Sequence, residues 1–342
     1  MTHEFKNIVD HALIAERNGM PSVLASVVAL DGSSYRRPGV RMLVLENEDM
    51  VGAVSGGCVE KEVLLQAQSV FKTGTSKIMT YDGRYRLGCE GILYILLELF
   101  NPQETFYEAF STCLKARIPF EILSFYKKNE GSFSGLGSYV KIDEALFPIS
   151  NTSINYDTNK LPVFKQHMQP RFKLVIIGAE HDAVKLCQYA NLTGWEVDIV
   201  SGIRAHKSID NFPGASTLVP IEPERLPVDK IDKQTAIVLM THNFATDLRY
   251  LVALKYTLPA YIGLLGPSKR RDDLLHQFLE YCPSINDSFL DCIHGPAGLN
   301  IGSETPEEIA ISIVSEILAF TRHQEAIPLS RKTGKIHPKK TL

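Results

Sequence analysis

Cys58 directly follows Gly56 and Gly57, where an apolar strand pattern changes to helical periodicity. The strand pattern ends near Ser55, and the apolar residues of 59–71 then recur at the three- and four-residue spacing of one helix face. Unbonded N–H groups at a helix start attract anions and also favour the ionised form of a thiol. The segment therefore predicts either a ligand, sulfur or metal site at Cys58 or a small buried cysteine in a strand-to-helix turn.

Two more loops combine residue types that suit a phosphate-bearing ligand. Guanidinium groups and hydroxyls hydrogen-bond phosphate oxygens, and a thiol can ligate a metal. The residues that carry this chemistry are Ser33, Ser34, Arg36 and Arg37 in the first loop and Gly88 and Cys89 in the second. If the strands around these loops pair, the loops and the Cys58 turn form one cup. The alternatives are a hairpin loop with solvated arginines and an incidental cysteine.

A different pattern begins at Arg171, where short apolar strands alternate with helical segments. This alternation predicts a parallel, doubly wound sheet, which binds ligands beyond the carboxyl ends of its strands. The candidate ligand residues at those ends are Gly178, His181, Thr241, His242, Asp247, Gly263, Gly266, Ser268, Arg270, His294 and Gly295. Ser268 is expected to cap a helix whose first turn holds three cations, which a bound phosphate or the following aspartates would offset. Solvated cations and structural histidines are the alternatives.

The elements that must position these residues divide the chain into two domains. Residues 1–150 begin with an amphipathic helix and continue with strands and further helices, which predicts an α+β domain. Periodicity fades in 151–170, the expected linker, and 171–321 form the expected Rossmann-like domain, with a glycine-rich loop at 294–299. The basic tail 322–342 is expected to be flexible.

The first turn of the second domain departs from the dinucleotide fingerprint GxGxxG. Gly178 supplies the first glycine, but Glu180 replaces the second, where its side chain and negative charge would face the pyrophosphate. Asp198 has the offset of a ribose-binding acid but falls inside a strand, and the strand end carries Ser201. We therefore expect a Rossmann-like fold without ordinary NAD(P) binding. The rival interpretation is an oxidoreductase that uses a nicotinamide cofactor in this domain.

Composition and charge narrow the class of protein. The chain has 342 residues, of which 22% are charged and 44% hydrophobic, and a formal net charge of −3, which argues against a nucleic-acid binder. It shows no signal peptide and no apolar run long enough to span a membrane, so we expect a cytoplasmic protein. The six cysteines are scattered without a CxxC pair, which favours reduced thiols over a structural zinc site.

Taken together, these motifs resemble the XdhC/CoxI family of xanthine dehydrogenase accessory factors. In the first domain the resemblance rests on 31–34, 37–39, 55–60 and the Gly88–Cys89 pair; in the second it rests on 241–242, 261–266, 294–296 and 305–310. The resemblance covers nearly the whole chain. The sequence departs from the family pattern at Glu180, at Ser201 and Gly202, where the family has acidic residues, and at Glu90, where it has glycine.

The resemblance implies a maturation role. Members bind the molybdenum cofactor transiently, protect it while its terminal sulfur is installed and help to insert it into a molybdenum hydroxylase. In this chain it implies a site that includes Ser55, Gly56, Gly57, Cys58 and Glu60, with Cys58 as a candidate molybdenum ligand. The expected partners are a xanthine dehydrogenase-type enzyme of purine catabolism, a cysteine desulfurase and a second copy of the chain in a homodimer. We expect a carrier without turnover, and a non-catalytic scaffold remains an alternative.

Overall fold

The computed structural model describes residues 1–32, 37–83, 91–151 and 160–333, and it leaves the side chain of Cys58 undescribed. The chain divides into two compact units, Met1–Arg171 and Phe172–Leu342. The first unit is a mixed α+β structure and the second has the Rossmann-like parallel sheet that the sequence predicts. Across the described ranges, no helix is both long and apolar enough to cross a bilayer.

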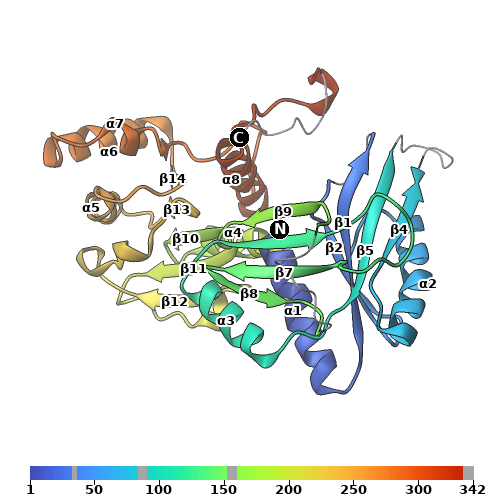
Figure 1. Ribbon diagram of the computed structural model, residues 1–342. Helices are drawn as coiled ribbons and strands as arrows, with labels where there is room; N and C mark the ends of the chain where they lie inside the picture. Colours follow the sequence, from blue (N-terminus) through green and yellow to red (C-terminus); the bar gives the residue numbers. More distant parts are fainter. Residues whose placement is uncertain (33–36, 84–90, 152–159, 334–342) are drawn as a thin grey trace. The chain divides into compact units, whose positions relative to one another are not determined.

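Two antiparallel sheets form the frame of the first unit (Figure 1). The first has the order β3-β2-β1-β5-β4 and consists of β1 (Ser22–Asp31), β2 (Arg41–Leu45), β3 (Met50–Gly52), β4 (Lys77–Asp82) and β5 (Ile92–Leu99). The second has the order β8-β7-β6-β9 and consists of β6 (Phe120–Phe125), β7 (Gly137–Ile142), β8 (Ala145–Pro148) and β9 (Val163–Met168). Runs of β-branched and aromatic residues favour these strands because such side chains pack well on a pleated surface.

Helices pack on both faces of the first sheet. They are α1 (Thr2–Arg17), α2 (Cys58–Thr73) and α3 (Glu104–Lys115). Val59, Val63, Ala67 and Val70 of α2 are buried against one face of the sheet, which confirms the apolar face predicted for 59–71. α1 and α3 share a separate core with the opposite face of this sheet and with strands of the second sheet. Because α2 packs on the first sheet, the position of its first turn relative to the strands is fixed.

The second unit is built on a six-stranded parallel sheet in the order β12-β11-β10-β13-β14-β15. Its strands are β10 (Lys173–Ile177), β11 (Glu196–Ser201), β12 (Thr217–Pro220), β13 (Thr235–Leu239), β14 (Tyr261–Leu264) and β15 (Ile293–His294). The order of the strands reverses between β10 and β13, and this reversal is the topological switch point of such folds. The carboxyl ends of the strands all meet at one edge.

Helices cover both faces of this parallel sheet (Figure 1). α4 (His181–Leu192) and α8 (Pro306–Thr321) pack on one face; α5 (Phe244–Leu254), α6 (Ser268–Tyr281) and the short α7 (Asp287–Leu290) pack on the other. Short 3₁₀ turns connect or follow these elements: η3 (Ile209–Asn211), η4 (Pro223–Arg225), η5 (Val228–Lys230) and η6 (Leu329–Arg331). The helix layers bury the central strands β10, β13 and β14, as a doubly wound sheet requires, whereas the edge strand β12 is mostly exposed.

Three details differ from the sequence prediction. Residues Val163–Met168 of the expected linker form β9, which pairs along its whole length with β6; its alternating exposed polar residues conceal the strand pattern. His294, expected in a loop, belongs to β15 and pairs with Gly263. Pro267, and not Ser268, is the N-cap of α6, because the extended backbone of Pro267 leads into the helix and Ser268 is already its first residue.

Candidate functional site

Three loops of the first unit leave the same edge of the first sheet. β1, β3 and β4 run in the same direction, so the segments after Asp31, Gly52 and Asp82 all start at this edge. The register places Asp31 and Asp82 on either side of Ile92, at the start of β5. The segments that lead into the three predicted loops therefore all start at the same end of the first sheet.

Several predicted residues of these loops lie outside the described part of the chain. They are Ser33, Ser34, Arg36, Gly88 and Cys89, together with the side chain of Cys58. The described members of the predicted set are Arg37, Ser55, Gly56, Gly57, Glu60 and the backbone of Cys58. Nowhere in ranges 1–32, 37–83, 91–151 and 160–333 do three or more His, Cys, Asp or Glu residues form a group that could hold a metal ion.

The turn at Gly56 and Gly57 is open. A Cβ atom added to either glycine would meet nothing within 4 Å. Gly57 is the N-cap of α2 and has φ +81°, a conformation that side-chain-bearing residues rarely adopt. The first N–H groups of a helix have no intrahelical partner, so the turn presents backbone donors toward open space. This is the geometry of an anion-binding helix start.

Glu60 fixes the backbone just before this turn through hydrogen bonds. Its carboxylate Oε1 accepts hydrogen bonds from the backbone N–H groups of Val54 (3.1 Å) and Ser55 (2.7 Å). The residue is buried, with 8% of its surface exposed, and its Oε2 is buried without a hydrogen-bond partner. Glu60 is also a predicted cofactor-binding residue, and its described contacts fix the backbone of the turn.

In the second unit, the predicted residue Asp247 contacts two others, Thr241 and Arg270. Its Oδ1 accepts a hydrogen bond from the Thr241 hydroxyl (2.6 Å), and its Oδ2 accepts one from Arg270 Nη2 (2.7 Å). The Asp247 side chain is only 3% exposed. Arg270 lies in the first turn of α6, where Arg271 also pairs with Asp272 (2.9 Å). Carboxylates of the chain therefore offset two of the three cations that the sequence analysis singled out.

The loops after β10 and β13 approach each other closely at the switch point. A Cβ atom at Gly178, which has φ +145°, would lie 2.3 Å from the carbonyl oxygen of Met240. This close approach requires glycine and explains why the first position of the fingerprint is kept. His242, at φ +57°, places its Nε2 3.6 Å from Asp182 Oδ2. His242 and Asp182 therefore link the loop after β13 to the first turn of α4.

His294 is enclosed by aromatic rings. It stacks on Tyr261 with a centroid distance of 4.5 Å and lies edge-on to Phe320 at 4.3 Å. Burial lowers the pKa of the His294 imidazole, although the Glu316 carboxylate, 3.9 Å from Nδ1, acts in the opposite direction. Glu316 also accepts hydrogen bonds from the Tyr261 hydroxyl and from the N–H of Gly298 (2.7 Å). The Nε2 atom of His294 is buried and has no hydrogen-bond partner among the described residues, so these contacts pack the ring without satisfying both of its nitrogens.

The remaining predicted residues also lie at the carboxyl edge of the parallel sheet. His181 is the first residue of α4, Gly263 is part of β14, Gly266 follows β14 and Gly295 follows β15. A Cβ at Gly295 would lie 2.6 Å from Arg271 Cγ, so this glycine lets β15 pack beside the start of α6. The sheet thus gathers the predicted set at one edge, as parallel topology requires.

Asp198, the candidate ribose-binding acid, has partners inside the sheet. Its carboxylate accepts a hydrogen bond from the Thr217 hydroxyl (2.6 Å) and pairs with Lys173 Nζ (3.0 Å). Glu180, at the position of the second fingerprint glycine, is the exposed N-cap residue of α4. A negative side chain at that helix start opposes a dinucleotide pyrophosphate, which needs backbone N–H groups there.

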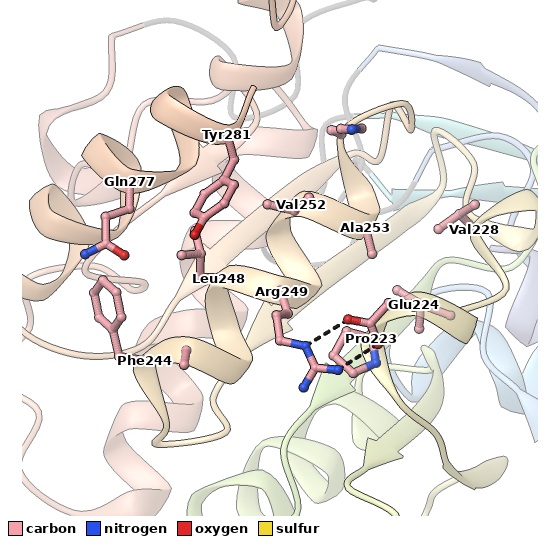
Figure 2. Close-up of a pocket in the computed structure, with 13 residues that line it drawn as sticks. Pro223, Glu224, Val228, Phe244, Leu248, Arg249, Val252, Ala253, Gln277 and Tyr281 are labelled. Carbon is pink, nitrogen blue, oxygen red and sulfur yellow. Dashed lines mark hydrogen bonds and ion pairs between the residues drawn. The ribbon is translucent and has the colours of Figure 1, made fainter. Parts of the chain in front are cut away.

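A cavity of about 670 Å³ lies beside α5 and α6 and contains none of the predicted site residues (Figure 2). Its wall is largely apolar and includes Phe244 and Tyr281. Arg249 also lines it, but the guanidinium donates hydrogen bonds to Glu224 (2.8 and 2.7 Å) and Glu222 (3.2 Å). An apolar wall with an engaged guanidinium does not suit a phosphate-bearing ligand.

Sequence reasoning missed two buried charges behind the first edge, Arg41 on β2 and Glu98 on β5. Their exposed fractions are 7% and 0%. Burial raises the pKa of Glu98 to about 7 and lowers that of Arg41 to about 10. The signal was present in the sequence, because a single charged residue inside an apolar strand is costly to bury and needs a reason.

Two family models match the chain. The model described as the XdhC Rossmann domain matches residues 174–317, which run from β10 to α8. The model of the XdhC and CoxI family matches residues 15–82, which include the Gly56–Gly57 turn and end with β4. The two matches fall in the second and the first unit, respectively.

Similar proteins extend the match over nearly the whole chain. A probable xanthine dehydrogenase subunit from Bacillus subtilis (strain 168) is 29% identical over 322 residues, which cover 90% of this chain and 94% of that protein. "Molybdenum cofactor insertion chaperone PaoD" of Escherichia coli (strain K12) is 23% identical over 330 residues, which cover 95% and 91%. A crystal structure described as a xanthine dehydrogenase from Bacillus halodurans has a TM-score of 0.77 at 24% identity, covers 95% of this chain and 99% of its own, and supports the fold.

Proposed function

Because this chain belongs to the XdhC and CoxI family, we propose that it binds the molybdenum cofactor and delivers it to a xanthine dehydrogenase-type enzyme. The names of two similar proteins, a molybdenum cofactor insertion chaperone and a probable component of a xanthine dehydrogenase, support this class of function. The cofactor is a pterin phosphate that holds molybdenum through a dithiolene. A carrier therefore needs hydrogen-bond donors for the phosphate and a thiol or polar lining near the metal.

The open turn at Gly56 and Gly57 is the observation that carries this proposal. Space around both glycines and the N–H groups at the start of α2 fit a phosphate, and exposed Arg37 supplies a cation at the same sheet edge. Cys58 is the first residue of α2, a position that favours the thiolate needed to ligate a metal. The residues present therefore fit the needs of the cofactor.

In the proposed site the chain binds and orients without turnover. The backbone of the turn and Arg37 hold the phosphate, and Glu60 keeps the turn in place through Val54 and Ser55. When bound, the cofactor supplies the molybdenum centre of the recipient enzyme. The function of this chain is then to keep the cofactor intact between its synthesis and its insertion.

The proposal extends to the partners and the compartment. We place the carrier in the cytoplasm, as a homodimer, between a cysteine desulfurase that installs the terminal sulfur and a recipient enzyme of purine catabolism. In support of a reducing compartment, Cys113, Cys187, Cys282 and Cys292 are free thiols.

The experiment compares the molybdenum and pterin content of three full-length proteins purified anaerobically from a cofactor-producing host. They are the wild type, Cys58→Ser and the control Cys292→Ser, whose thiol donates a hydrogen bond to the Ser288 carbonyl (3.2 Å) in the second unit. Loss of a metal-site thiol should lower the cofactor content about tenfold in Cys58→Ser only. Equal content in Cys58→Ser and wild type would remove Cys58 from the site, and no cofactor in any of the three would contradict the carrier function.

A further inference from the structure

Arg41 is a buried cation in the interior between the two sheets of the first unit. Arg41 pairs with Ser26 across β1 and β2, and Leu24 pairs with Glu98 across β1 and β5. Directly paired residues and residues two apart share a face of a sheet, so Ser26, Arg41 and Glu98 lie on one face. This face packs on the second sheet, where Glu98 Oε2 accepts a hydrogen bond from the N–H of Ser138 (2.8 Å).

The Arg41 guanidinium lies 5.6 Å from the centroid of the Phe5 ring, but its hydrogen-bonding groups are poorly satisfied. Arg41 Nε and Nη2, Glu98 Oε1 and Ser26 Oγ are all buried without a hydrogen-bond partner, in residues that are at least nine-tenths buried. Unpartnered buried donors and acceptors cost free energy, and replacing a buried ion pair by apolar residues is often neutral or stabilising. The unsatisfied groups of Arg41 therefore direct attention to what its two hydrogen bonds hold in place.

The two hydrogen bonds that Arg41 does make show this role. Nη1 donates to the carbonyl oxygen of Gly39 (3.0 Å) and to Oε1 of Gln166 on β9. Gly39 has φ +100°, donates its N–H to the carbonyl of Val27 (2.8 Å), and leaves no room for a Cβ, which would lie 2.5 Å from the Gln166 amide nitrogen. Arg41 and Gln166 thus clamp Gly39, two residues after Arg37.

We infer that Arg41, together with Gln166, is a positioning residue that fixes the turn carrying Arg37 in the orientation needed to bind a phosphate-bearing ligand. The inference rests on the proposed function and adds a residue to it. A cation held in its binding orientation before the ligand arrives loses less conformational freedom on binding, which raises affinity. Arg41 would therefore act on the ligand through the backbone of Gly39, just as Glu60 acts through Val54 and Ser55.

The test combines amide hydrogen exchange of residues 37–41 with cofactor content. The full-length variants are Arg41→Met, Gln166→Ala, the conservative Arg41→Lys and the control Arg249→Met, which removes an exposed guanidinium from the second unit. In Arg41→Met we expect exchange of the Gly39 amide to rise about tenfold and the cofactor content per folded protein to fall about tenfold. The melting temperature should also fall, because the variant removes the cation that faces the buried Glu98 carboxyl group. Gln166→Ala should show the same changes in exchange and cofactor content, Arg41→Lys a partial rescue, and Arg249→Met none of them.

Two results would overturn the inference, and a third would overturn only the proposed function. Wild-type exchange in both Arg41→Met and Gln166→Ala would overturn the inference. A cofactor loss that only follows the loss of folded protein, without rescue by Arg41→Lys, would also overturn it, because a purely structural residue behaves in that way. If the wild type holds no cofactor while exchange rises as expected, the clamp is supported and the proposed function fails.

Discussion

Each unit presents glycine turns and helix starts at one edge of a sheet, and charged residues pair at both edges, since Asp31 of the first unit pairs with Lys128. At the edge of the second unit, predicted ligand residues contact neighbouring elements: Asp247 pairs with Arg270, and the His242 imidazole lies 3.6 Å from Asp182. At the edge of the first unit, the glycine turn faces open space, and a buried carboxylate, Glu60, holds it from behind. Similar residue types therefore contact one another at the second edge and leave the glycine turn exposed at the first, which we call the open edge.

Two residues of the second unit depart from the usual dinucleotide site. The second unit has the strand order and switch point of dinucleotide-binding proteins. Asp198 is nevertheless bound to Thr217 and Lys173, and Glu180 occupies the start of α4. A Rossmann-like fold therefore does not by itself argue for a nicotinamide cofactor in this chain.

Removing Asp247 should disrupt the contacts at the edge of the second unit and have the largest effect on stability. Asp247→Ala leaves Arg270 without its counter-charge and leaves the Thr241 hydroxyl with only the Asn243 carbonyl (3.1 Å) as an acceptor, so we expect a loss of about 3–5 kcal/mol. Denaturant unfolding measures this loss, and Asp247→Asn, which keeps an acceptor for Thr241, should lose less. A loss below about 1 kcal/mol in Asp247→Ala would mean that the pair does not organise this edge.

A dependence on pH should mark the interior behind the open edge. Burial raises the pKa of Glu98 to about 7, so the folded protein holds this proton more tightly than the unfolded chain does. The stabilisation is full below the ordinary pKa of 4.5 and is lost as the pH rises to about 7. Over that window the unfolding free energy should fall by roughly 3 kcal/mol because of Glu98.

Glu98→Gln isolates this effect, because the amide keeps an acceptor for Ser138 but does not titrate as a carboxyl group. Denaturant unfolding of both proteins near pH 5 and near pH 8 should show a steeper fall for the wild type. The same fall in both proteins would show that Glu98 is not the titrating group.

Sequence reasoning predicted the elements that have strong patterns. The helix face of 59–71 and the strand–helix alternation after Arg171 both rest on residues repeated many times, so single exceptions do not hide them. β15 was missed because its two residues, Ile293 and His294, are too short a run to show alternation. β9 was missed because exposed polar residues interrupt its apolar ones.

The site was predictable only in part, for a similar reason. Spacing in the sequence indicated Gly56 and Gly57 as a turn before a helix, and the structure has this turn. Spacing does not reveal that Glu60 reaches back to Val54 and Ser55, because that contact depends on the path of the turn. The clamp of Arg41 on Gly39 joins β2 to β9 across 125 positions of sequence through Gln166, and local patterns contain no such information.

The central claim, that the ligand binds at the open edge, is tested most directly by one variant at each edge. Arg37→Ala and Lys269→Ala each remove an exposed cation, the first beside the open edge and the second in the first turn of α6. The measurement is the molybdenum and pterin content of the full-length proteins purified anaerobically. The account predicts a fall of about tenfold in Arg37→Ala, as expected for one lost charge-assisted hydrogen bond, and wild-type content in Lys269→Ala. A fall in Lys269→Ala with wild-type content in Arg37→Ala would contradict it.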